Sequence, residues 1–150
     1  MKISENFLMQ EFLTLEDYNE VIKSENPETE FYKLVDKNII IIAQFLRELI
    51  GKPLVVNNWH AGGKFSLRGR RPLKTKIGAR FSMHKQGKAF DFSVEDISSK
   101  NIKKIVIENE IKLYELGARR MESHLFSPTW CHIDLKNNPK IVNKLHIFVP

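Results

Sequence analysis

The chain of 150 residues has a single cysteine, Cys131, and no long apolar run. One cysteine excludes an intramolecular disulfide, so nothing in the composition ties the chain to an oxidising compartment. The longest apolar stretch, Ile39 to Ala43, is far shorter than the roughly 20 residues that cross a bilayer, so we expect no membrane insertion. The first residues lack the apolar core of a signal peptide. We therefore expect the product to be made and kept in the cytoplasm unless another machinery releases it.

Repeats, low-complexity segments and linkers are missing as well, so the sequence predicts one domain over residues 1–150. A chain of this length can bury a core without covalent cross-links. Its hydrophobic fraction of 42% and charged fraction of 28% are ordinary for a soluble globular protein.

The net charge of +6 is unevenly distributed. Residues 1–63 carry 6 basic and 10 acidic residues, whereas the remainder carries 18 and 8. The segment from Lys64 to Arg80 contains seven basic residues and no acid. Such a stretch favours an anionic partner, although a solvated basic loop has the same composition. It has one aromatic residue, Phe65, so stacking platforms for bases are scarce and nucleic acid is the least favoured partner.

Apolar periodicity predicts two main helices. Between about Glu28 and Ile50 the apolar residues recur at spacings of three and four, and Gly51 and then Pro53 end the helix. The same spacing predicts a second helix over roughly Ser99 to Leu116. Both helices have one apolar face and can therefore pack on a common core.

Short alternating or β-branched segments predict a sheet. Strands are expected at residues 54–56, 89–94, 119–123 and 129–135. A turn near residue 127 joins the last two strands, which makes them an antiparallel pair. Residues 61–79 are rich in glycine and basic residues and predict a long surface loop, of a length that is usually functional. The predicted fold class is α+β, with two main helices packed over a small, mostly antiparallel sheet.

Two histidines and one aspartate from separate segments are the most informative feature of the chain. His84 and Asp91 lie seven residues apart, and His132 follows near the end. Gly87 permits a tight turn and the small Ala89 a close approach, so the turn can bring His84 and Asp91 to one ion. Two imidazoles and one carboxylate are enough to hold a catalytic zinc ion while its fourth position stays open to water. The residues therefore predict a small zinc metallohydrolase.

Other side chains are expected near this site. Asp91 lies between two phenylalanines on a strand, faces away from them, and needs a partner if it is buried. Asp134 shares a strand face with His132. A turn centred near residue 127 places Glu122 across from His132. Trp130 is either core filling or a wall of the pocket.

These residues resemble the motif of the zinc D-Ala-D-Ala carboxypeptidase family. That family includes bacterial D,D-carboxypeptidases, vancomycin-resistance D,D-dipeptidases and many phage endolysins, and the Hedgehog signalling domain shares its fold. The resemblance covers most of the chain, with weaker similarity in residues 3–12 and 46–54. The positions that carry it are Ser82, His84, Gly87, Ala89, Asp91, Trp130, His132 and Asp134.

The resemblance implies a set of site residues. His84, Asp91 and His132 would be the zinc ligands, and Ser82 a supporting polar residue beside the first of them. Family members bind the substrate carboxylate or the polarised carbonyl through an arginine that precedes the first ligand, because a guanidinium can donate two parallel hydrogen bonds. The candidates for that arginine are Arg71 as first choice, and Arg68 and Arg80 as alternatives.

The chain departs from the family at the general base. Many members carry a carboxylate three residues before the last histidine, and Thr129 stands there. Glu122 is the first candidate for the base and Asp134 the alternative. Asp134 could equally fix the tautomer of His132 by accepting its ring hydrogen.

The resemblance implies hydrolysis of peptide bonds in peptidoglycan stem peptides, as a D,D-carboxypeptidase or an endopeptidase. A wall hydrolase without an export signal suits a phage lysin that is released to act on the cell wall, or a virion-associated protein. The alternative is a zinc-binding module of the same fold that has lost catalysis and serves in wall binding or as a viral structural part.

Overall fold

The central feature of the fold is a five-stranded sheet, which a computed structural model of all 150 residues describes. The strands are β1 (Leu54–Val55), β2 (Ala89–Val94), β3 (Arg120–Glu122), β4 (Cys131–Asp134) and β5 (His146–Phe148). Their order across the sheet is β1-β2-β4-β3-β5. All neighbours are antiparallel except β3 and β5, which are parallel. The predicted α+β class with a mostly antiparallel sheet is confirmed.

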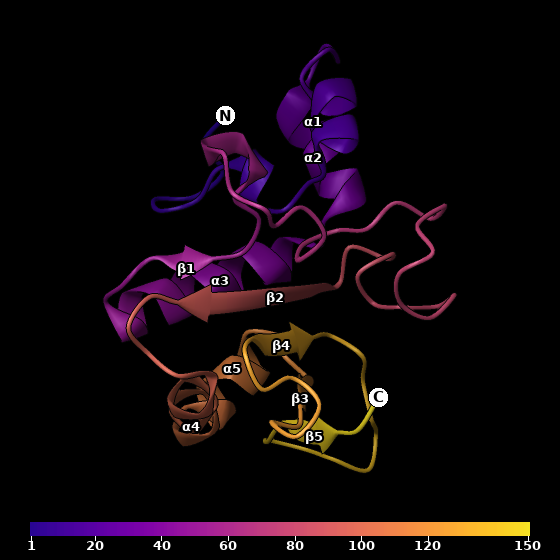
Figure 1. Cartoon of the computed structure of the whole chain (residues 1–150). Helices are drawn as coiled ribbons and strands as arrows, with labels where there is room; N and C mark the ends of the chain where they lie inside the picture. Colours follow the sequence, from indigo (N-terminus) through magenta and orange to yellow (C-terminus); the bar gives the residue numbers. More distant parts are fainter.

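Helices cover this sheet and extend beyond it. They are α1 (Leu15–Val21), α2 (Pro27–Leu34), α3 (Lys37–Ile50), α4 (Ser99–Glu108) and α5 (Glu110–Glu115), with two short 3-10 helices at Met9–Glu11 and Trp59–Ala61. Figure 1 shows β2 crossing the middle of the molecule, with α1 and α2 at one end and β3, β4 and β5 at the other. None of the helices combines the length and apolar character that crossing a membrane requires.

Both long helices predicted from periodicity are interrupted in the structure. The first breaks after α2, where Val35 has an extended backbone and the side chain of Asp36 caps α3 by accepting a hydrogen bond from the amide of Asn38. The second breaks at Asn109, between α4 and α5. Periodicity continues across each break because the helices on both sides turn apolar residues toward the same core.

The core lies around β2, which is buried along nearly its whole length. Phe90 and Phe92 are fully buried and stacked, with ring centroids 5.4 Å apart. Phe12 from the N-terminal segment packs on Phe90 at 6.2 Å. Because alternate residues of a strand face opposite ways, the phenylalanines that anchor β2 leave Asp91 on the other face.

A turn before β2 is fixed by a close backbone contact. Gly87 has φ +67° and its carbonyl accepts a hydrogen bond from the amide of Asp36, at 2.9 Å. A Cβ at Gly87 would lie 1.8 Å from the carbonyl oxygen of Leu34, so only glycine fits. The junction between α2 and α3 thereby holds the turn that carries His84.

Candidate metal centre

The three predicted ligands meet on one face of the sheet. Asp91 of β2 and His132 of β4 are directly paired in the antiparallel register, and His84 comes from the turn before β2. All three side chains are buried, with at most 7% of each residue exposed. The group could hold a metal ion, because it offers two imidazole nitrogens and a carboxylate oxygen toward one point.

The distances between the facing atoms agree with this. Nε2 of His84 lies 3.2 Å from Nδ1 of His132 and 3.2 Å from Oδ1 of Asp91. Nδ1 of His132 lies 2.7 Å from the same oxygen. In a tetrahedral zinc site with bonds of about 2.0–2.1 Å, ligand atoms are about 3.3 Å apart. Small shifts of these side chains would therefore form one triangular face of such a site.

The atoms of His84 and Asp91 that point away from the centre are bonded to the basic segment from Lys64 to Arg80, which we call the basic loop. Nδ1 of His84 donates a hydrogen bond to the carbonyl of Gly69 at 2.8 Å, so this nitrogen carries the hydrogen and Nε2 is left with a lone pair. Nη2 of Arg71 donates to Oδ2 of Asp91 at 3.0 Å. The backbone adds to this order, since the amide of Asp91 donates to the carbonyl of Arg68 at 2.7 Å.

The outward atom of His132 is held by Asp134 of the same strand, β4, and Asp134 is held in turn by Arg120 of β3. Nε2 of His132 lies 3.0 Å from Oδ2 of Asp134, which is fully buried. Arg120 donates to Asp134 from both Nε and Nη2, at 2.9 and 2.6 Å. A carboxylate behind a histidine is the arrangement that orients metal ligands and raises their basicity.

These contacts test whether a metal fits. Nδ1 of His84 and Nε2 of His132 can both donate hydrogen bonds away from the centre. The three atoms that then face the centre, which are Nε2 of His84, Nδ1 of His132 and Oδ1 of Asp91, are all acceptors. Buried acceptors that face one another need a cation or a proton between them. The centre is therefore arranged to bind a positive charge, and zinc suits two imidazoles and one carboxylate.

Without a metal, a proton can supply that charge. Burial disfavours the imidazolium of His132, but hydrogen bonds to Asp134 and Asp91 outweigh burial and raise the pKa of His132 to about 9. Burial also favours the neutral acid of Asp91, yet the adjacent His84 and His132 hold the pKa of this carboxyl below its usual range. Burial alone would raise the pKa of Asp134, but its hydrogen bonds with His132 and Arg120 outweigh burial and lower it.

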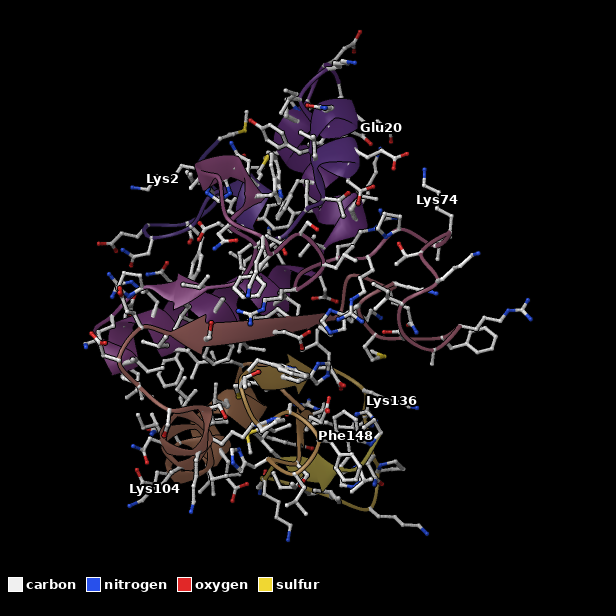
Figure 2. All side chains as sticks on the ribbon, viewed as in Figure 1. Lys2, Glu20, Lys74, Lys104, Lys136 and Phe148 are labelled. Carbon is white, nitrogen blue, oxygen red and sulfur yellow. The ribbon has the colours of Figure 1, made fainter.

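The centre opens into a pocket of about 570 Å³, which we call the first hollow. Its size is within the range of small-molecule sites, about 300–1,000 Å³. Apolar side chains from the loop before β2 and from the C-terminal segment line it, together with all three ligands. The predicted site residues that line it are Arg71, Ser82, Glu122, Trp130 and Asp134. Figure 2 shows Lys136 and Phe148, two further lining residues, on the same side of the molecule as Lys74 of the basic loop.

Glu122 reaches the first hollow through the predicted hairpin. The structure pairs Arg120 with Asp134 and Met121 with Ile133, so the next position in this register sets Glu122 opposite His132. Unlike Asp134, the side chain of Glu122 makes no salt bridge.

The three candidate arginines are placed differently. Arg71 lines the first hollow and is bonded to Asp91 and to the carbonyl of Leu67. Arg68 donates to the carbonyl of Val55 and lies 3.4 Å from the ring of Phe65, in a neighbouring hollow. Arg80 is exposed on the loop and does not line either hollow.

Sequence reasoning missed two residues that shape the centre. Arg120 could have been found, because a turn centred near residue 127 pairs it with Asp134. Phe148, whose ring packs edge-on at 5.6 Å from His132, lies on β5. That strand has only three residues and none is buried, so it has no alternating pattern to detect.

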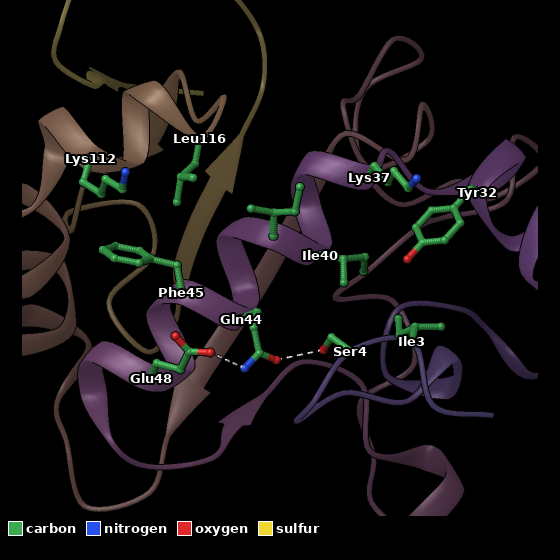
Figure 3. Close-up of a pocket in the computed structure, with 11 residues that line it drawn as sticks. Ile3, Ser4, Tyr32, Lys37, Ile40, Gln44, Phe45, Glu48, Lys112 and Leu116 are labelled. Carbon is green, nitrogen blue, oxygen red and sulfur yellow. Dashed lines mark hydrogen bonds between the residues drawn. The ribbon is translucent and has the colours of Figure 1, made fainter.

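The molecule has another hollow, on the outer surface of α3 (Figure 3). It has a volume of about 390 Å³ and is lined by Ile40, Phe45 and other mostly apolar residues. Gln44 crosses it, accepting from Ser4 at 2.8 Å and donating to Glu48 at 2.7 Å. It includes no histidine or cysteine, so we place the chemistry of the protein in the first hollow.

Comparison of the chain with protein-family models, with curated proteins and with solved structures finds no match. What the structure defines is an α+β domain with a buried His-Asp-His centre that could hold a metal ion.

Proposed function

We propose that the protein is a zinc-dependent hydrolase that cleaves peptide bonds in peptidoglycan stem peptides. The observation that carries this proposal is the convergence of three acceptor atoms of His84, Asp91 and His132 beside an open pocket. The motif similarity to zinc D-Ala-D-Ala carboxypeptidases supports the substrate class. The same resemblance extends to phage endolysins, which supports a phage lysin or a virion-associated protein.

The residues around the centre would divide the work. Zinc held by these ligands would lower the pKa of a water to about 7 and polarise the scissile carbonyl. Glu122 accepts a proton as the water oxygen bonds to the carbonyl carbon, and returns it to the nitrogen as the carbon–nitrogen bond breaks. Arg71 holds Asp91 and presents its guanidinium to the first hollow, where it can donate to the developing oxyanion. Ser82 and Trp130 contact the bound peptide.

The proposal is tested by metal content and by products. The purified protein should contain about one zinc per chain, lose it to a chelator and regain it on reloading. Only the loaded form should release new fragments from purified muropeptides, identified by mass spectrometry. His132→Ala should lose both zinc and activity, whereas His60→Ala, at an exposed histidine away from the centre, should keep both. Wild-type cleavage rates in His132→Ala would refute the assignment.

Thr129 favours a second candidate, a zinc-binding module without hydrolysis. This residue stands where the family carries its base, and it is exposed at the rim of the neighbouring hollow. A protein that binds zinc at one per chain and retains intact muropeptides without cleaving them would be such a module.

A further inference from the structure

The neighbouring hollow beside Arg68, which we call the second hollow, adjoins the first one. It has a volume of about 370 Å³ and is lined by Lys64, Phe65, Arg68 and six other residues. Three of its lining residues, Arg71, Asp91 and Trp130, also line the first hollow. Because Asp91 is a candidate metal ligand, the two hollows adjoin at one edge of the candidate metal centre. Each alone is in the size range of a ligand pocket, about 300–1,000 Å³.

The second hollow is cationic. Lys64, Arg68 and Arg71 line it, and its one acid is Asp91, which Arg71 already pairs. Neither Lys64 nor Arg68 has a carboxylate partner anywhere in the protein. Both charges lie over the ring of Phe65, at 5.4 and 3.4 Å from its centroid. One aromatic ring therefore gathers two cations that form no salt bridge, beside the candidate metal centre.

The first hollow has a different character. Ile77, Phe81, Phe148 and other apolar side chains line much of it, and Arg120 is fully occupied by Asp134. An enzyme that removes a C-terminal residue needs a closed end with an unpaired cation for the terminal carboxylate. Here both hollows reach Asp91. Two of the three lining cations without a salt bridge, Lys64 and Arg68, lie together in the second hollow, whereas the third, Lys136, lines the first.

From this arrangement we propose that the substrate is a peptide that continues on both sides of the cleaved bond. Its carboxylate-bearing segment lies in the second hollow. This inference rests on the proposed hydrolase function. The protein then acts as an endopeptidase on anionic peptides. Lys64 is a specificity-determining residue, because it recognises a side-chain carboxylate of the substrate segment that lies next to the cleaved bond.

The test compares synthetic peptides of one core sequence. One peptide extends on both sides of the scissile bond, and another ends in a free carboxylate two residues after it. Each is made with glutamate or glutamine on either side of the bond. We expect the extended peptide to have a kcat/KM at least about tenfold higher, because binding energy from both segments contributes to catalysis. Equal or faster release of the terminal dipeptide would overturn the endopeptidase assignment.

Lys64→Gln tests the cationic hollow, with Lys76→Gln as control. Both lysines are exposed on the same loop, but Lys76 lines neither hollow. For the wild type, kcat/KM for one glutamate peptide should be about three- to fivefold higher than for the matching glutamine peptide, as expected for an exposed ion pair. Lys64→Gln should abolish that preference and Lys76→Gln should keep it. Equal effects of the two variants would overturn the role of Lys64.

Binding of fluorescent peptides by anisotropy, in chelator, separates this proposal from hydrolysis itself. If binding depends on glutamate and on Lys64 but the zinc form cleaves no peptide, the hydrolase is refuted, while the two-sided groove for anionic peptides stands. Neither binding nor cleavage would refute both.

Discussion

At the residue scale, the centre contains two carboxylates beyond the ligands, and their surroundings give them different tasks. Asp134 is fully buried, bonded to His132 and held by two hydrogen bonds from Arg120. Burial alone would raise its pKa, but these partners outweigh burial and lower it, so Asp134 is a poor proton acceptor. Glu122 lines the first hollow without a salt-bridge partner. We therefore infer that Asp134 orients His132 and Glu122 is the base.

Exchanging each carboxylate for its amide separates these two tasks. Glu122→Gln should lower kcat by about 10²- to 10⁴-fold and leave zinc affinity unchanged, because it removes only the proton acceptor. Asp134→Asn should weaken zinc binding by roughly 10- to 100-fold, because His132 loses its orienting partner. Competition with a chelating dye measures the affinity, and peptide cleavage at saturating zinc measures kcat. A Glu122→Gln protein with the wild-type rate would exclude Glu122 as base.

Cys131 lies next to His132 but takes no part in the site. It is fully buried, and burial raises the pKa of its thiol to about 12. Since the thiolate is the reactive form, iodoacetamide at pH 8 should label the native protein negligibly and the urea-unfolded protein completely. Mass spectrometry of intact protein reads out the labelling. Rapid modification of the native protein would show that β4 opens locally.

How far the sequence predicts the site depends on the residue. The turn at Gly87 and the alternation along β2 were enough to group His84 with Asp91, whereas His132 joined them through the motif resemblance. The ranking of the three arginines, with Arg71 first, could not be drawn from periodicity, because each lies in a loop and its place depends on backbone contacts. Those contacts, such as the hydrogen bond from the amide of Arg71 to the carbonyl of His84 at 3.0 Å, have no signature in the sequence.

At the scale of elements, the turn at residues 84–88 connects the helical layer to the metal centre. Its glycine packs against the α2–α3 junction, and its histidine faces β4. The same break between α2 and α3 that periodicity failed to predict is therefore what receives the turn. The strand β5 was missed for another reason, since a short, half-exposed parallel strand depends on its partner β3 for its conformation.

Gly87→Ala should be strongly destabilising, and Gly51→Ala is its matched control. Both glycines have positive φ, +67° and +71°, so both variants carry the backbone cost of about 1–2 kcal/mol. Only at Gly87 would the new Cβ overlap backbone, so we expect a loss of roughly 3 kcal/mol or more there. Urea unfolding at equal protein concentration measures the difference. Equal losses would show that the turn does not pack as described.

At the scale of the whole molecule, the candidate metal joins parts of the chain that are distant in sequence. His84 belongs to the loop region, whereas Asp91 and His132 lie on neighbouring strands. The residues from 62 to 88 form no helix or strand, and they bond to the sheet at Asp91 through Arg71 and at Val55 and Ser93 through Arg68. A ligand that binds only the folded state stabilises it by mass action, so metal occupancy should be visible in global stability.

Zinc should therefore raise the melting temperature of the protein, and it should do so by binding at the His84, Asp91 and His132 centre. At a free concentration a thousand times its Kd, zinc adds about 4 kcal/mol, which corresponds to roughly 10 °C for a chain of this size. Differential scanning fluorimetry with chelator, and then with excess zinc, measures the shift. His132→Ala should show none, because one of three ligands is lost, while Glu122→Gln should shift like the wild type. A shift of the same size in His132→Ala would place the zinc at another site, and no shift in the wild type would mean that the convergence of the three side chains binds a proton alone.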